Sequence, residues 1–216
     1  MDSRVKILGK NNSCLSQILY ELRDETIQRD RLRFRTNLER IGEILAYEIS
    51  REFAYSPKTV TTPLGELEMQ LPEKNPVLVS ILRAGVPLHN GLLRMFDHAD
   101  NGFISAFRQH TSENEFVVKV EYTAIPDVTN RDLILIDPMI ATGRSIILSL
   151  KEILQAGIPD QIFVAGVVAS EEGVEYVLRN MPKARIYVAA VDNELTAKSY
   201  IVPGLGDAGD LAFGPK

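Results

Sequence analysis

The sequence predicts an α/β protein with a mainly parallel central sheet flanked by helices. Short apolar runs of strand length alternate with stretches whose apolar residues recur at helical spacing. Small polar turns join several of these runs to the helix that follows. The expected strands are residues 76–82, 103–107, 133–136, 161–169 and 185–191. Ser170 is expected to cap the helix after the fourth of them.

The composition is that of a soluble globular protein of one domain. The chain has 216 residues, 45% hydrophobic and 25% charged, and a formal net charge of −5. This charge argues against non-specific binding to nucleic acid or to a membrane surface. Cys14 is the only cysteine and the three histidines are scattered, which argues against a disulfide and a zinc cluster. No apolar run approaches the roughly 18 residues of a membrane span, and no secretory signal is evident, so we expect a cytoplasmic protein.

Two helical stripes precede the first of these strands. The first comprises Leu15, Ile18, Leu19 and Leu22; the second comprises Leu38, Ile41, Ile44, Leu45 and Ile49. Thr36 and Glu39 form a candidate capping box for the second helix. Packing against the core is the favoured role of this wide stripe, and packing against a second subunit is the alternative. Residues 58–71 then predict a hairpin arm around Thr62-Pro63-Leu64-Gly65.

The apolar run of residues 133–136 is followed by Asp137 and then by a short turn, residues 141–145. Ile146, Leu150, Ile153 and Leu154 continue it as one helix face, with Gly157 as the expected C-terminal cap. Unpaired N–H groups and the helix dipole favour a phosphate at such a helix start. A carboxylate just before it can accept hydrogen bonds from sugar hydroxyls, so this crossing could hold a ribose 5-phosphate. The alternative is an ordinary turn with a threonine N-cap.

Two further strands end in arginine. Arg83-Ala84-Gly85 follows residues 76–82, and Pro87 suits the first turn of the next helix. Arg108 follows residues 103–107, and the polar residues 109–123 predict a lid or mobile loop. Ligands of open α/β sheets bind at the carboxyl ends of strands near a topological switch point, so we expect both arginines beside Asp137. For Arg83, a solvated arginine in a loop is the alternative.

Residues 200–214, hereafter the base segment, contain four glycines, a proline and two aspartates. This composition predicts neither a regular helix nor a regular strand. Its apolar residues argue against a disordered tail. Backbone N–H and C=O groups of glycine-rich loops can match a flat ligand at close range.

Two of these motifs resemble those of a known family. The block Ile136-Asp137-Pro138-Met139-Ile140-Ala141-Thr142-Gly143-Arg144-Ser145 resembles the phosphoribosyl pyrophosphate (PRPP) loop of type I phosphoribosyltransferases, in the form used by uracil phosphoribosyltransferases. The base segment is similar to the C-terminal signature of that same family. Arg144 stands where the family usually has a second glycine. The resemblance extends from about residue 76 to residue 216.

The resemblance implies the type I phosphoribosyltransferase fold, with a flexible hood loop, and the conversion of uracil and PRPP to UMP and diphosphate in pyrimidine salvage. It implies catalytic roles for Arg83, Arg108 and Asp137. It implies PRPP contacts from Arg83, Arg108, Asp137, Pro138, Met139, Ile140, Ala141, Thr142, Gly143, Arg144, Ser145 and Asp207. It implies uracil contacts from Ile201, Gly206, Asp207 and Ala208.

The resemblance also implies Mg²⁺ held mainly through PRPP and water, GTP as an effector, and a homo-oligomer, either a dimer or a tetramer. We expect one domain over residues 1–216: a helical part (1–57), the arm (58–71), a PRPP-binding core (76–195) and a uracil-binding end (196–216). Another base on the same scaffold, and a nucleotide sensor without turnover, are the rival functions. No residue is assigned as general base.

Overall fold

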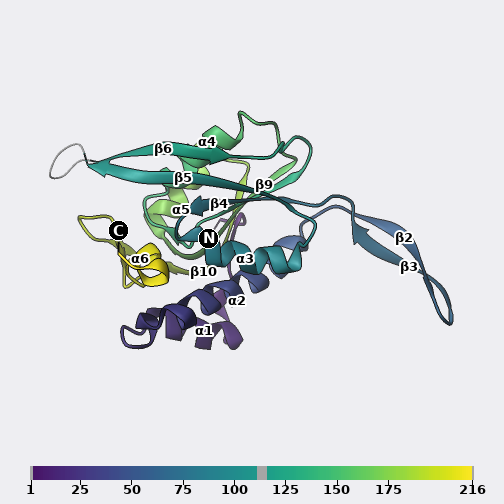
Figure 1. The fold of residues 1–216 in the computed structure, drawn as a ribbon, viewed down its shortest axis with the longest axis horizontal. Helices are drawn as coiled ribbons and strands as arrows, with labels where there is room; N and C mark the ends of the chain where they lie inside the picture. Colours follow the sequence, from purple (N-terminus) through teal and green to yellow (C-terminus); the bar gives the residue numbers. More distant parts are fainter. Residues whose placement is uncertain (1, 111–115, 216) are drawn as a thin grey trace.

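A computed structural model describes residues 2–110 and 116–215, with the side chains of residues 106–120 left out of the description. Its main sheet has the strand order β1-β10-β9-β7-β4-β5-β6, with β8 added beside β9. The strands are β1 (Val5–Ile7), β4 (Val77–Leu82), β5 (Asp100–His110), β6 (Phe116–Ala124), β7 (Asp132–Ile136), β8 (Met139–Ile140), β9 (Gln161–Ser170) and β10 (Ala184–Asp192). All neighbours are parallel except β5 and β6. The predicted α/β architecture is confirmed (Figure 1), and the short edge strand β1 is an addition to it.

Helices cover both faces of the sheet, because successive side chains of a buried strand point in opposite directions. In β7, Ile134 and Ile136 join the core beneath α1 (Cys14–Arg23), α2 (Arg31–Ser50) and α3 (Gly85–Met95). Leu133 and Leu135 join the core beneath α4 (Arg144–Ile153) and α5 (Glu171–Asn180). All four side chains are fully buried, each contributing about 1.5–3 kcal/mol of hydrophobic stabilisation.

The order of the strands reverses between β4 and β7, which lie side by side. From β4 the chain passes through α3 to β5 on one side; from β7 it passes through α4 to β9, and through α5 to β10, on the other. Adjacent crossovers that diverge in this way leave a crevice outside the carboxyl ends of the two strands. Arg83 and Asp137 each follow directly after one of these strands.

The second helix begins earlier than its predicted capping box. Helix α2 begins at Arg31, and the Asp30 carboxylate caps it by accepting hydrogen bonds from Leu32 N (2.9 Å) and Arg33 N (3.1 Å). The Thr36–Glu39 box is therefore wrong as a helix start. Phe34 is buried and extends the apolar face one turn toward the N-terminus, and its packing in the core stabilises the extra turn. Two short 3₁₀ turns, η1 (Leu8–Lys10) and η2 (Ile27–Arg29), flank α1, and its N-cap is Ser13.

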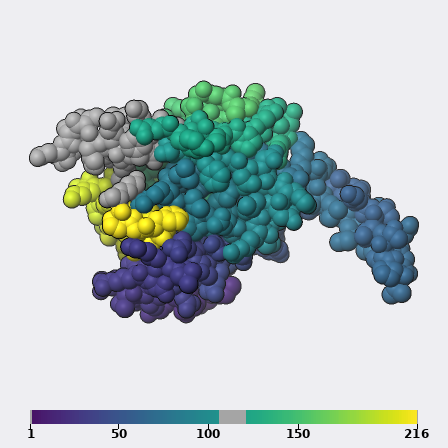
Figure 2. Space-filling model, in the orientation of Figure 1, coloured from purple at the N-terminus to yellow at the C-terminus, as the bar shows by residue number. Residues whose placement is uncertain are grey.

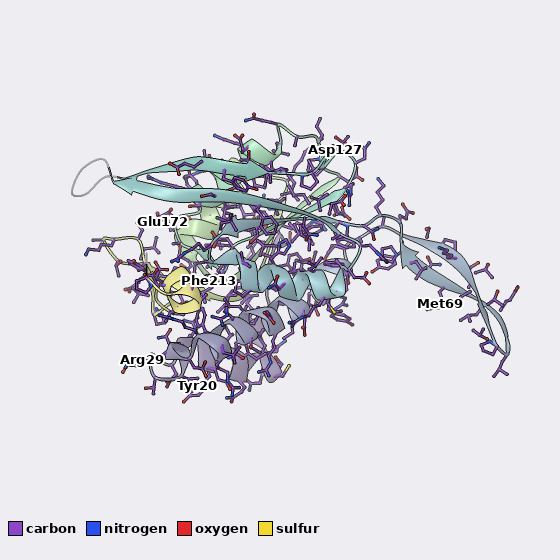
Figure 3. All side chains as sticks on the ribbon, viewed as in Figure 1. Tyr20, Arg29, Met69, Asp127, Glu172 and Phe213 are labelled. Carbon is purple, nitrogen blue, oxygen red and sulfur yellow. The ribbon has the colours of Figure 1, made fainter. Side chains whose placement is uncertain are left out.

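The hairpin arm forms as predicted but begins three residues earlier. Strands β2 (Tyr55–Thr62) and β3 (Gly65–Pro72) pair in antiparallel register, with Thr62 opposite Gly65. The arm projects from the body of the molecule (Figures 1 and 2). Met69, labelled in Figure 3, and Leu67 are each 47% exposed. Leu64 at the tip is 99% exposed.

The stretch predicted as a long polar connection is mostly strand. Strand β5 continues to His110 and β6 begins at Phe116, and the two pair in antiparallel register with an irregularity between Ser105 and Ala106. The β-branched residues of the Phe116–Ala124 strand explain the difference, because valine and threonine favour an extended backbone. Residues 111–115 of the predicted hood lie outside the described residues.

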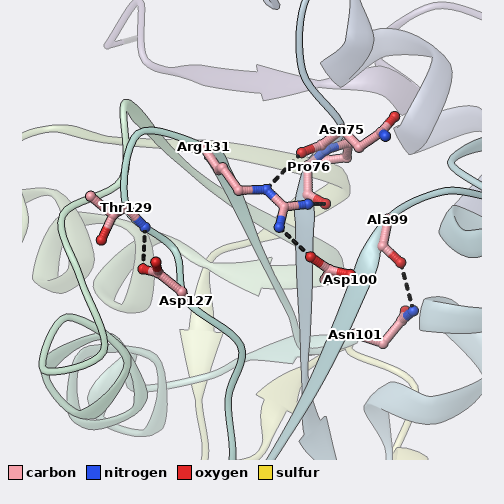
Figure 4. Close-up of polar contacts among 8 residues, drawn as sticks. All are labelled: Asn75, Pro76, Ala99, Asp100, Asn101, Asp127, Thr129 and Arg131. Carbon is pink, nitrogen blue, oxygen red and sulfur yellow. Dashed lines mark hydrogen bonds and ion pairs between the residues drawn. The ribbon is translucent and has the colours of Figure 1, made fainter.

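Polar contacts join the segments at the amino ends of β4, β5 and β7 (Figure 4). The Arg131 guanidinium donates to Asn75 O (3.0 Å) and Pro76 O (3.1 Å), and it pairs with the Asp100 carboxylate. Gly157 lies near this end of the sheet, since a Cβ there would sit 2.3 Å from Thr129 Oγ1. Helix α4 ends at Ile153, so the prediction of Gly157 as its cap is wrong. Within residues 2–110 and 116–215, no helix is long and apolar enough to cross a membrane.

Candidate active site

The turn formed by residues 83–85 joins β4 to α3 against the end of β7. Gly85 is needed there, since a Cβ would lie 2.9 Å from Ile136 O and 2.4 Å from Ser80 Oγ. No backbone carbonyl or buried side chain can yield at such distances. This close approach brings the turn against the last residue of β7, which Asp137 directly follows.

Backbone hydrogen bonds to β9 hold the chain after β7. Asp137 N donates to Ala165 O (3.1 Å), and Pro138 O accepts from both Val167 N and Val168 N (3.0 Å each). Met139, the first residue of β8, then pairs with Val168 of β9. The Ile140 side chain is fully buried in the core beneath α4 and α5, so only its backbone is available to a ligand.

Residues 141–145, hereafter the phosphate loop, contain the glycine that precedes helix α4. Gly143 is the N-cap, with φ of 71° and no side-chain cap, and Arg144 is the first helical residue. The Thr142 hydroxyl lies 3.5 Å from Arg144 N, at the outer limit of a hydrogen bond. The alternative of a threonine N-cap is therefore wrong. The helix start keeps backbone N–H groups suited to a phosphate.

The start of helix α5 packs against the phosphate loop. The Ser170 hydroxyl donates to Ala141 O (2.5 Å) and accepts from Gly173 N (2.8 Å), which also confirms Ser170 as the cap of α5. A Cβ on Gly173 would lie 2.2 Å from Ala141 O, and one on Gly143 would lie 2.7 Å from Gly173 O. The two glycines therefore let the loop and the start of α5 approach each other.

We expect Gly143→Ala to weaken phosphate binding about tenfold or more and to destabilise the fold by about 1–2 kcal/mol, because alanine disfavours positive φ. Calorimetric titration with ribose 5-phosphate and thermal unfolding measure the two effects. Gly65→Ala is the matched control, since Gly65 also has positive φ but has no atom within 4 Å of the added Cβ. Equal ribose 5-phosphate affinity in both variants would contradict a phosphate site at Gly143.

The base segment contains short regular elements, contrary to the prediction. Strand β12 (Ile201–Val202) pairs with β11 (Glu194–Leu195), and helix α6 spans Ala208–Phe213. The Asp207 carboxylate caps α6 by accepting from Asp210 N (3.0 Å). Burial of Ala208 and Ala212 offsets the cost of the helical glycine between them.

Helix α6 reaches the Arg83 side chain. Arg83 Nη2 donates to Asp210 Oδ1 (3.0 Å) and to Gly214 O (2.9 Å), and a Cβ on Gly209 would lie 3.9 Å from Nη2. Asp210 is a site residue that sequence reasoning missed. Its signal was its position as the second aspartate of the C-terminal signature, where only the first was assigned a role.

The structure brings most of the predicted site residues to one edge of the sheet. Arg83, Asp137 and the phosphate loop meet at the β4–β7 switch point, and α6 brings Asp207 and Ala208 to the Arg83 turn. Gly206 lies on the exposed backbone before α6, while the Ile201 side chain is buried, which leaves its main chain for a ligand. The backbone of Arg108 lies in β5, three residues past the partner of Leu82; its side chain lies outside the description.

Comparisons with known proteins agree with this arrangement. A family model described as Uracil phosphoribosyltransferase matches residues 9–215. The chain is 49% identical over 210 residues to a protein of that name from Porphyromonas gingivalis, covering 97% of each chain. It is 39% identical to a protein of the same name from Pyrococcus furiosus, covering 93% of this chain and 86% of the relative. The solved structure of the AQ2163 protein from Aquifex aeolicus superposes with a TM-score of 0.87 at 27% identity, covering 97% of this chain and 98% of that one.

Proposed function

The chain belongs to the uracil phosphoribosyltransferase family, and we propose that the carboxyl edge of its sheet binds PRPP and uracil side by side. The enzyme converts uracil and PRPP to UMP and diphosphate. One observation supports the location above all: the β4–β7 switch point places a basic turn, a carboxylate and a helix N-terminus next to one another. That set matches the diphosphate, ribose and 5-phosphate of PRPP in turn.

We assign PRPP binding to four groups of residues. Backbone N–H groups of the phosphate loop, with the Thr142 and Ser145 hydroxyls, hold the 5-phosphate. The Asp137 carboxylate accepts hydrogen bonds from the ribose hydroxyls. Arg83 holds the diphosphate, because a guanidinium matches phosphate oxygens bidentately; Arg108 is proposed to share this role. Pro138, Met139, Ile140, Ala141 and Arg144 complete the backbone path around the ribose phosphate.

We assign uracil recognition to main-chain groups of Ile201, Gly206 and Ala208 in the base segment. Uracil offers two carbonyl acceptors and an N3–H donor, which backbone groups can match. Asp207 caps α6 through one carboxylate oxygen, and the second oxygen is proposed to face PRPP.

The proposed chemistry depends on positioning and electrostatics. Displacement at the anomeric carbon develops positive charge on the ribose ring and negative charge on diphosphate. The Asp137 carboxylate stabilises the first charge and the Arg83 guanidinium stabilises the second. A hood contributed by β5 and β6 excludes water that would otherwise hydrolyse PRPP.

Mg²⁺ fits this donor set as a partner of the substrate. In the part of the chain whose side chains are described, no group of three or more His, Cys, Asp or Glu residues lies together as a metal cage. Mg²⁺ commonly keeps several waters and binds through phosphates and one or two carboxylates, here those of Asp137 and Asp207. Bound with PRPP, it would neutralise charge on the leaving diphosphate.

Further properties are proposed on the family relationship. We propose a cytoplasmic homo-oligomer, a dimer or a tetramer, and the exposed apolar residues of the arm support assembly. GTP activation rests on the family alone. A single domain is supported by the shared sheet, since both core clusters include its strands.

Incubation of the purified protein with labelled uracil, PRPP and Mg²⁺ tests this function directly. UMP should form from uracil and not from cytosine or hypoxanthine supplied in parallel. A nucleotide formed from another base would overturn the base assignment. PRPP binding without any nucleotide product would favour the rival function, a nucleotide sensor without turnover.

A further inference from the structure

An ion pair joins the first helix to the base segment. Arg23, the last residue of α1, donates from Nη1 to Asp192 Oδ2 (2.7 Å) and from Nη2 to Asp192 Oδ1 (2.9 Å). The same Nη1 donates to Gly204 O (2.9 Å), and Gly204 N donates to Asp192 Oδ2 (2.9 Å). Both backbone groups of Gly204 are thereby satisfied by one charged pair.

The pair is shielded from solvent and its geometry is demanding. Asp192, at the end of β10, is 9% exposed, and the Arg23 side chain is 25% exposed. Gly204 has φ of 57°, and a Cβ there would lie 2.2 Å from Ile201 O. The turn thus depends on glycine for its shape and on Arg23 and Asp192 for its hydrogen bonds. A charge-assisted bidentate pair in a shielded site is stronger and more directional than an exposed one.

Helix α2 holds the other end of the same segment. Arg35 Nη1 donates to Ala212 O (2.7 Å), in α6. The apolar side chains of the base segment, Ile201, Leu205, Ala208 and Ala212, lie in one core cluster with Leu15, Leu22 and Phe34 of the first two helices. The N-terminal helices therefore form the surface on which the base segment rests.

We propose that Arg23 and Asp192 are positioning residues for the uracil site. They fix the backbone at Gly204, which lies between the proposed uracil contacts Ile201 and Gly206. Recognition by main-chain groups has no side-chain rotamer to adjust, so a small shift of the turn misplaces the N–H and C=O groups together. Loss of the pair should therefore weaken uracil binding while PRPP, held at the β4 and β7 ends, binds as before. This inference rests on the proposed uracil site.

Steady-state kinetics of Arg23→Ala and Asp192→Ala test the inference. Each should raise the KM for uracil about tenfold, which corresponds to about 1.4 kcal/mol, and change the KM for PRPP less than about twofold. Arg23→Lys, which keeps a cation but cannot pair with both carboxylate oxygens of Asp192 through two separate nitrogens, should lie between wild type and Arg23→Ala. The double alanine variant should raise the uracil KM by less than the product of the two single effects, because both substitutions break the same ion pair.

Arg4→Ala is the matched control, since Arg4 also pairs with an aspartate, Asp2, and donates to a distant carbonyl, Pro182 O (2.8 Å), but touches no residue of the base segment. It should leave both KM values unchanged. An unaltered uracil KM in all Arg23 and Asp192 variants would overturn the positioning role, as would equal rises in both KM values. If the alanine variants do not fold, the change in the uracil KM of Arg23→Lys, compared with the change in its PRPP KM, tests the inference. A wild-type enzyme that makes no UMP would instead refute the proposed function.

Discussion

Replacing Asp137 by Asn should lower the rate of UMP formation about 10²–10³-fold while the protein stays folded. Asparagine keeps the size of the side chain and an oxygen that can accept from Met139 N, as Asp137 Oδ1 does at 3.2 Å. It loses the negative charge next to the developing ribose cation, and removal of one preorganised electrostatic contact typically costs that much. Turnover at saturating uracil and PRPP, together with thermal unfolding, measures both effects.

Asp132→Asn provides the control at the opposite end of the same strand. Burial is the main cause that raises the pKa of Asp132, ahead of the opposing hydrogen bond with Gln161. A raised folded-state pKa means that ionised Asp132 costs stability at neutral pH and that this cost disappears as the pH falls through that pKa. Asp132→Asn should therefore keep full turnover and unfold at an equal or higher temperature at pH 7, with the difference shrinking in acid. Full turnover of Asp137→Asn would remove Asp137 from the mechanism.

Replacing Arg83 by Ala should raise the KM for PRPP about 10–100-fold. A hydrogen bond to a charged group contributes about 1.5–3 kcal/mol, and each 1.4 kcal/mol is tenfold in affinity. Because Arg83 Nη2 also donates to Asp210 and to Gly214 O, the variant loses its contacts with α6 and its C-cap as well. Asp210→Ala separates the two effects, since it removes the ion pair with α6 and keeps the guanidinium; its PRPP KM should rise far less.

Arg94→Ala is the matched control for Arg83→Ala. Arg94 lies near the far end of the same helix that Arg83 precedes, and its guanidinium pairs with Glu39 and Glu43. It should leave the PRPP KM unchanged. A rise as large in Asp210→Ala as in Arg83→Ala would show that Arg83 acts by holding α6 in place, and the assignment to diphosphate would then fail.

The parts of the fold that could be predicted are those specified by local sequence. The buried run before Asp137 predicts a strand because four apolar residues in succession suit a strand covered on both faces. The turn after it predicts a helix start because a glycine and small polar residues precede a clear helical stripe. The arm follows from turn residues between two extended runs. In each case, the residues that specify the element lie within it or directly beside it in the sequence.

The features that could not be predicted depend on partners far apart in the chain. Arg23 and Asp192 are 169 residues apart, and neither has a local pattern that marks it as part of a site. Arg83 was predicted as a site residue from its own turn, but its contact with Asp210, 127 residues away, could not be predicted from that turn. Helix α6 was missed because glycine content outweighed its capping aspartate, and only burial against α2 decides between the two. The strand β6 was missed because its charged residues, Lys119 and Glu121, outweighed its valine and threonine residues.

The docking of the base segment onto the first helices has a consequence for biosynthesis. Arg23 and Gly204 are 181 residues apart, so at typical elongation rates of 5–20 residues per second the ribosome makes α1 about 10–40 s before its partner. During that interval α1 can pack against α2 and the sheet, but the part of their apolar surface that the base segment covers stays exposed to solvent. Docking of the base segment then buries that surface and completes the proposed uracil site in one step. We therefore expect a nascent chain to bind uracil only after this segment has docked.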